Sequence, residues 1–195
     1  MANVDAAFGF RAVRDLSGGP YNGPQTTYEI AASYGTAMYV GHPVLETGDC
    51  NAEGIPQVEI ATTGSSNTAT AVIEGFEPLP TSLDTKYFAA SAASARKVYC
   101  VEITHNQVFE IQEDSEGGAL TTASVGLNAN WSNAGGSTVT GLSTIELDSS
   151  SAATTNSLSL RILRPSPRIG NAIGDNCVWL VKFNFPQSVD PDGIS

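Results

Sequence analysis

Apolar and polar residues alternate through much of this chain with a period of two, which is the pattern of a half-buried β-strand. The most hydrophobic segment is residues 178–185 (VWLVKFNF), in which Trp179, Val181, Phe183 and Phe185 would share one face of the strand. Alternation of the same kind predicts further strands at residues 26–30, 36–40, 57–62, 67–76, 97–104, 108–112, 144–147 and 158–163.

Turn-forming residues separate these segments at intervals of about 8–12 residues, and a helical period is nearly absent. The turn His105-Asn106-Gln107 lies between two predicted strands, and this spacing predicts a hairpin. Residues 121–127 predict a single helical turn with Thr121 or Thr122 as its N-cap. The pattern indicates an all-β fold, with a single barrel- or sandwich-like domain, an extended N-terminal arm and long loops.

We divide the chain into three parts on this basis. Residues 1–24 form an N-terminal arm, residues 25–187 form the β-domain, and residues 188–195 form a flexible C-terminal tail. Since no internal repeat and no sharp change of composition interrupts residues 25–187, we expect one domain there.

The arm combines aromatic and basic side chains before it reaches a stretch rich in glycine and proline. Phe8 and Phe10 would share a side of an extended backbone, and Arg11 and Arg14 follow them. One interpretation is that the arm lies on a partner, to which it adds backbone hydrogen bonds and two aromatic anchors. The other is that it forms the first strand of the domain's own sheet, and the sequence leaves both open.

Acidic residues outnumber lysine and arginine by 20 to 9, which gives a net charge of −11. A chain of this charge repels phosphate on average, so we do not expect nucleic acid as a partner. No run approaches the roughly 20 apolar residues of a membrane span, and no leader sequence is visible. We therefore expect no membrane association and synthesis in a cytoplasm.

Three of the few basic residues lie close together, at Arg161, Arg164 and Arg168. Salt bridges to the abundant carboxylates would explain them. A contact with an acidic partner surface or a neighbouring subunit would also explain them, because the guanidinium group pairs with a carboxylate through two hydrogen bonds. The candidate partner-binding residues are therefore Phe8, Phe10, Arg11, Arg14, Arg161, Arg164 and Arg168.

The sequence carries no motif for catalysis or for a cofactor, and we expect neither an enzyme nor a bound cofactor. His42 and His105 each stand at a predicted turn, without a companion in a known catalytic spacing. We expect both to be surface residues. Only these histidines and scattered carboxylates would support a hydrolase function.

Two acidic segments, residues 110–116 and 190–193, could approach a calcium ion with Glu110, Glu113, Asp114 and Glu116 or with the aspartates of DPDG. A solvated face and a turn explain both segments more simply, so we expect no metal site. The three cysteines are odd in number, and their spacings match no CxxC or zinc pattern. We expect Cys100 and Cys177 in the core and Cys50 in a loop.

Several segments together resemble a family of viral structural proteins. The opening residues 1–11 (MANVDAAFGFR), followed by Tyr21-Asn22-Gly23, are similar to the start of small structural proteins encoded near the major capsid gene of tailed bacteriophages. The similarity covers most of the chain and continues through residues 108–114, 125–130, 135–143 and 179–181, with Asn171 and Gly174. None of these segments carries chemistry, so their specificity lies in their combination.

The resemblance implies a capsid decoration (cement) protein. Such proteins sit on the outside of an icosahedral head, commonly as homotrimers, and bridge adjacent subunits of the major capsid protein. They are not enzymes. An alternative is a carbohydrate-binding β-sandwich on a virion surface or fibre, with stacking platforms supplied by aromatic residues: Trp131, Tyr21, Tyr87 and Tyr99.

Overall fold

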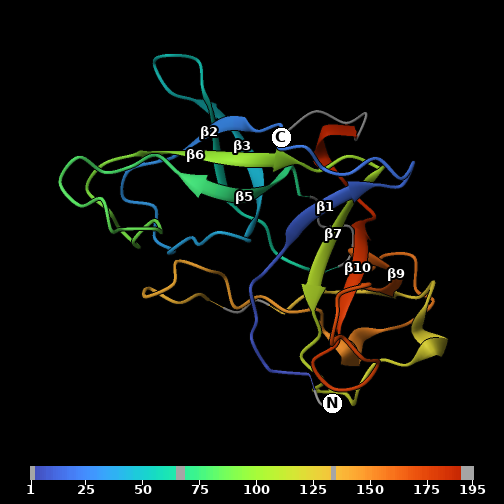
Figure 1. Ribbon diagram of the computed structural model, residues 1–195. Helices are drawn as coiled ribbons and strands as arrows, with labels where there is room; N and C mark the ends of the chain where they lie inside the picture. Colours follow the sequence, from blue (N-terminus) through green and yellow to red (C-terminus); the bar gives the residue numbers. More distant parts are fainter. Residues whose placement is uncertain (1–2, 65–68, 133–134, 190–195) are drawn as a thin grey trace.

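The computed structural model describes residues 3–64, 69–132 and 135–189 and confirms the all-β class (Figure 1). The described residues form ten strands in two sheets, with three short 3-10 turns. The first sheet closes into a five-stranded barrel in the order β2-β4-β3-β5-β6. Its strands are β2 (Thr26–Ile30), β3 (Pro43–Cys50), β4 (Pro56–Ile60), β5 (Ala71–Phe76) and β6 (Arg96–Glu102).

Side chains fill the inside of the barrel because inward and outward residues alternate along each strand. In β5, Ala71 and Ile73 point inward, whereas Val72 points outward into a different apolar cluster. The inner cluster is completed by residues of the other strands and of two loops: Tyr28, Ile30, Met38, Val44, Val58, Phe88, Val98 and Cys100.

The second sheet is open, with the strand order β1-β7-β10-β9-β8. Its strands are β1 (Arg11–Asp15), β7 (Gln107–Gln112), β8 (Asn128–Ala129), β9 (Leu160–Pro165) and β10 (Val178–Phe183). Its inner face packs on the outside of the barrel, because Val72, Val101 and Ile103 share one apolar cluster with Trp179 and Val181. The two sheets therefore form one folded unit.

Four aromatic rings form the centre of this shared cluster. The ring of Phe10 lies 4.9 Å from that of Phe183 and 5.8 Å from that of Trp131, centroid to centroid. Phe109 meets Phe183 edge to face at 5.4 Å. Such contacts add to the free energy gained by burying the rings.

Several predicted elements are confirmed. Strand β2 has the predicted bounds, and β10 buries Trp179, Val181 and Phe183 on one face. The 3-10 turn η1 (Thr122–Ser124) follows Thr121, whose side chain accepts a hydrogen bond from the Ala123 N–H. None of the described helical segments is long and apolar enough to cross a membrane.

Other predicted elements are wrong. The segments on either side of His105 do not form a hairpin, since β6 pairs with β2 and β5 whereas β7 pairs with β1 and β10. The turn instead carries the chain from the barrel to the open sheet. Residues 36–40 and 144–147 make only isolated bridges, and residues 67 and 68 of the predicted strand 67–76 lie outside the described residues.

Strand β3 is absent from the sequence prediction, because Gly41 and Pro43 are turn-forming residues that favour the end of a strand. Pro43 instead occupies the first position of β3, where a proline is tolerated. Further along, the ladder with β4 shifts register between Glu46 and Cys50, and Gly48 adopts a φ of 86° within that shift.

Candidate partner-binding face

The N-terminal segment is part of the domain's own sheet rather than a free arm. Strand β1 pairs with β7 from Arg11 opposite Glu110 to Asp15 opposite Gln107. The other edge of β1 is occupied as well. The Phe10 N–H donates to the Gly41 carbonyl at 2.9 Å, and the Val13 carbonyl accepts from the Tyr21 N–H at 3.1 Å. This edge therefore does not offer the open row of backbone groups that strand addition requires.

Phe10 is not available as a partner anchor, because it is 2% exposed and lies among the aromatic rings of the core. Phe8 does not share its environment. Gly9 lies between the two with a φ of 72°, which turns Phe8 onto the outer face of the sheet. There the Phe8 ring contacts two guanidinium groups, those of Arg11 and Arg168, each 5.0 Å from its centroid.

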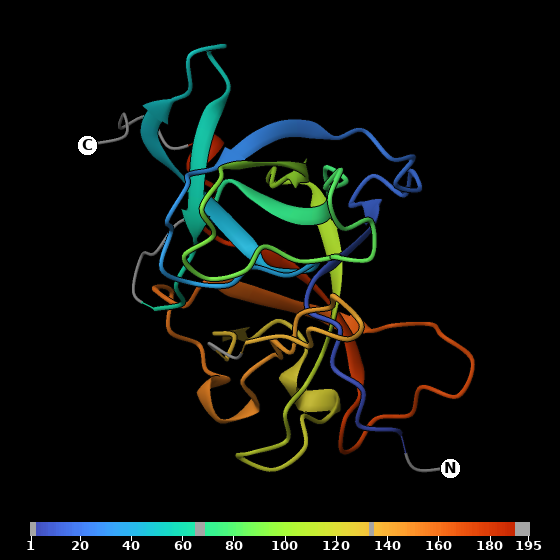
Figure 2. The same ribbon diagram turned by 90° about the vertical axis from the view of Figure 1, so that its left-hand side faces the viewer.

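Residues 3–8 lie across the outer face and are tied to it by side chains. The Gln112 amide donates to the Val4 carbonyl and accepts from the Ala6 N–H, both at 2.8 Å. The Asn3 amide donates to the Ala172 carbonyl at 2.8 Å and accepts from the Ala172 N–H at 3.0 Å. Figure 2 shows this segment beside the loop between β9 and β10, at one end of the molecule.

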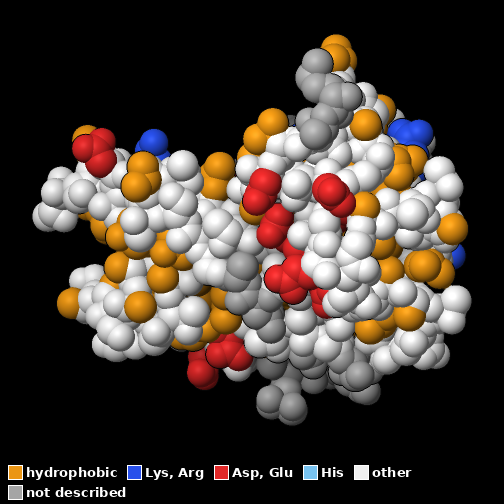
Figure 3. Space-filling view, turned by 90° about the horizontal axis from the view of Figure 1, so that it is seen from below, with side chains coloured by type: hydrophobic (Ala, Val, Ile, Leu, Met, Phe, Trp, Pro, Cys, Tyr) orange, Lys and Arg blue, Asp and Glu red, His pale blue; other side chains and the backbone are white. Residues whose placement is uncertain are grey.

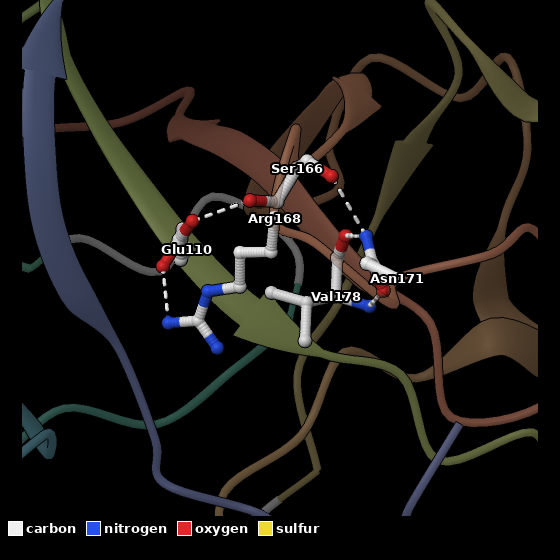
Figure 4. A network of polar contacts seen from close by, with 5 residues as sticks. All are labelled: Glu110, Ser166, Arg168, Asn171 and Val178. Carbon is white, nitrogen blue, oxygen red and sulfur yellow. Dashed lines mark hydrogen bonds and ion pairs between the residues drawn. The ribbon is translucent and has the colours of Figure 1, made fainter.

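A polar network fixes that loop to the sheet (Figure 4). The buried Glu110 carboxylate accepts from the Ser166 hydroxyl and from the Arg168 guanidinium. Asn171 donates to the carbonyls of Ser166 and Val178 and accepts from the Val178 N–H, each at 2.9 Å. The loop therefore has a defined conformation although it leaves the sheet.

The strand registers bring most of the candidate arginines onto the same outer face. Residues directly opposite each other in an antiparallel pair share a face. Arg11 lies opposite Glu110, Arg14 opposite Val108, and Arg164 opposite Leu180. Six of the nine lysines and arginines lie on this face, which we call the basic face: Arg11, Arg14, Arg161, Arg164, Arg168 and Lys182.

One group of carboxylates includes Glu146 and also Asp5 of the N-terminal segment. Figure 3, a view from below, shows Asp and Glu side chains in the middle of the view and Lys and Arg side chains at its edges. Burial raises the pKa of Glu146 to about 7, and the neighbouring carboxylates of Asp5, Asp114 and Glu116 contribute in the same direction. The molecule is thus acidic overall with its cations concentrated on one sheet face.

Exposed apolar side chains lie at the end of the basic face where the N-terminal segment meets the β9–β10 loop. Val4 is 76% exposed, Ile169 is fully exposed, and Ile173 is 45% exposed. Val4 and Ile169 border a hollow of about 200 Å³ together with Phe8 and Arg168. The sequence did not single out these three residues, since an isolated isoleucine or valine carries no functional signal.

The salt-bridge interpretation of the arginine cluster is confirmed for one of its three residues. Arg168 forms the one ion pair in the part of the chain that the structure describes, with Glu110. Arg161 and Arg164 are exposed on β9 without such a pair.

The prediction for the two histidines is half right. His105 is exposed, but His42 is fully buried, with its Nε2 atom 3.2 Å from the Gly135 carbonyl. Burial lowers the pKa of His42 to about 4, so the ring is neutral at pH 7. The loop that carries Gly135 covers this turn, and the local sequence around His42 gives no sign of it.

The solvated acidic face predicted for residues 110–116 is also wrong in part. Glu110 and Glu113 are buried, and Glu113 accepts hydrogen bonds from the Leu120 N–H at 3.0 Å and the Trp179 indole at 3.2 Å. Burial raises the pKa of Glu113 to about 7. Within the described ranges no cluster of three His, Cys, Asp or Glu residues could hold a metal ion, and residues 190–193 lie outside them.

The remaining candidates take ordinary positions. Cys100 and Cys177 are buried as predicted, whereas the exposed Cys50 ends strand β3 instead of lying in a loop. Trp131 is 1% exposed, so it cannot serve as the stacking platform of a carbohydrate site.

Comparisons with protein-family models, with curated proteins and with solved structures give no match.

Proposed function

We propose that this protein is a capsid decoration protein. It binds the outer surface of an icosahedral phage head as a homotrimer and stabilises the shell by bridging adjacent subunits of the major capsid protein. The observation that carries the proposal is the combination, on one rigid sheet face, of six cations with exposed apolar residues next to Phe8. The resemblance of the sequence to phage structural proteins supports the same function.

The basic face has the composition of a protein–protein interface. Arginine and aromatic side chains are enriched in such interfaces, and the face carries five arginines beside Phe8. Ile169 and Val4 border a hollow that a partner side chain can enter. The Asn171 and Gln112 hydrogen bonds hold these residues in place before binding. A surface fixed in advance loses less conformational entropy when it binds.

The stabilisation is mechanical. A molecule that contacts two neighbouring subunits must be released before the subunits separate, so its binding free energy adds to the stability of the shell. Many copies on one lattice multiply a modest individual contact. Virion localisation on the capsid exterior, after synthesis in a host cytoplasm, belongs to the same proposal.

Sedimentation of purified phage heads tests this function. Heads that lack the protein are mixed with the wild-type chain or with the Ile169→Asp variant, and bound protein is measured in the pellet. Ile169→Asp should reduce occupancy at least about tenfold, because it places a charge in an apolar contact. Leu83→Asp, at a 76% exposed leucine of the barrel loop, is the matched control and should bind as the wild type does.

A further inference from the structure

Two cations face each other across strands β9 and β10. Arg161 lies directly opposite Lys182 in the ladder, and Arg164 follows on the same face, opposite Leu180. Like charges directly opposite each other in a sheet are destabilising. This part of the basic face, which we call the β9–β10 cation group, is therefore unfavourable in the isolated molecule.

The cations of this group are not neutralised by carboxylates of the chain's own described residues. It contains 20 acidic residues, yet no carboxylate of the described residues forms an ion pair with Arg161, Arg164 or Lys182. Arg168, a few residues further along, shows the contrast, since Glu110 neutralises it. The repulsion within the group is relieved when anions from another molecule come between the cations.

We infer that Arg161, Arg164 and Lys182 form a docking site for a carboxylate-rich protein surface. The inference rests on the proposed function, under which the capsid protein supplies that surface. Arginine suits carboxylates because its planar guanidinium group donates hydrogen bonds to both oxygens at once.

A protein surface fits this site better than a nucleic acid does. Nucleic acid is a long polyanion that would extend beyond the basic face onto a molecule of net charge −11. A compact acidic patch on a protein can contact the cation group without extending onto the acidic remainder of the molecule. Because Arg161 and Arg164 are exposed and Lys182 is half-buried, these charges act mainly on the association rate, and binding weakens as the salt concentration rises.

An NMR titration tests the site without phage heads. The 15N-labelled protein is titrated at low salt with an octaglutamate peptide and, separately, with an eight-residue oligodeoxythymidylate. Octaglutamate should shift amide signals of β9 and β10, and the double variant Arg161→Gln/Arg164→Gln should lose these shifts. The control Lys86→Gln/Lys97→Gln removes the same charge from the barrel and should keep them. Shifts spread over the whole surface, or a stronger response to the oligonucleotide, would overturn the inference.

Head binding separates this inference from the function on which it rests. Arg161→Glu/Arg164→Glu should weaken wild-type head binding about tenfold or more, whereas Arg161→Lys/Arg164→Lys should weaken it only a few fold. If the wild type binds heads and the glutamate variant binds within twofold of it, the docking site is wrong and the function stands. If the wild type does not bind heads but octaglutamate shifts β9 and β10, the function is wrong and the site stands.

Discussion

Gly9 and Gly41 pack backbone against backbone where the N-terminal segment passes the barrel. A Cβ atom on Gly41 would lie 2.5 Å from the Phe8 carbonyl oxygen, and one on Gly9 would lie 2.6 Å from the Gly41 carbonyl oxygen. Both residues also have positive φ angles, 72° and 90°. This contact fixes the path of the segment that carries Phe8 to the basic face and Phe10 to the core.

Gly41→Ala should therefore destabilise the fold strongly. The substitution adds backbone strain of about 1–3 kcal/mol to a steric clash with backbone atoms that cannot move aside. We expect a total loss of about 3 kcal/mol or more in urea unfolding. Gly23→Ala is the control, since Gly23 has a similar φ of 86° but open space around it, and should cost about 1 kcal/mol. Equal losses for the two variants would contradict the close approach.

Phe8 and Phe10 should differ sharply when each is replaced by alanine. Phe10→Ala removes a ring from the centre of the core and should lower the unfolding free energy by about 3–5 kcal/mol. Phe8→Ala removes contacts with two guanidinium groups at the surface and should cost about 1 kcal/mol. Urea unfolding of both variants measures the difference. A Phe10→Ala protein as stable as Phe8→Ala would mean that the N-terminal segment is a separable arm after all.

Glu113 should make the protein less stable as the pH rises. Its pKa is raised from an ordinary 4.5 to about 7 in the folded protein, so between these values the folded state keeps a proton that the unfolded chain has released. Stability from this group is therefore present below about pH 4.5 and is lost as the pH rises to about 7. The loss amounts to at most about 3 kcal/mol.

Glu113→Gln isolates this effect, because glutamine has nearly the same shape and does not titrate. The unfolding free energies of wild type and variant are compared at several pH values between 5 and 8. The unfolding free energy of the variant should rise relative to that of the wild type as the pH rises. A constant difference over this range would show that Glu113 is ionised in the folded protein throughout.

Asn171→Ala should loosen the β9–β10 loop without removing any exposed group of the basic face. Three hydrogen bonds to Ser166 and Val178 are lost, which should cost about 1–3 kcal/mol. Hydrogen exchange should speed up in residues 166–177, and head binding should weaken because the loop must be ordered on binding. Asn22→Ala, at an exposed position between β1 and β2, should change neither the exchange nor head binding. Unchanged exchange in the Asn171 variant would contradict the rigidity argued for the loop.

The sequence predicted those elements whose local pattern agrees with their environment in the fold. Strand β10 alternates because one face lies on the shared core, and Thr121 caps its turn through bonds within a few residues. The hairpin predicted at His105 is wrong because contacts between residues far apart in the sequence decide which strands pair. The turn chemistry fits a hairpin, but Val101 and Phe109 pack on the same core from two different sheets.

The sequence predicted most of the residues of the basic face but not how the fold brings them together. Arg11 and Arg161 are remote in the sequence, and only the strand order β1-β7-β10-β9 brings them to one face. Phe8 and Phe10 look equivalent in sequence, and a single glycine conformation sends one outward and the other into the core. The exposure of Ile169 depends on a loop held by Asn171, which no periodicity reveals.

Cryo-electron microscopy of phage heads incubated with the purified protein tests the central claim most directly. We predict added density on the outer surface of the shell, with the basic face of β1, β7, β10 and β9 turned toward the capsid protein and Ile169 at the contact. Heads without added density, or molecules attached through the barrel loop that carries Leu83, would contradict the account.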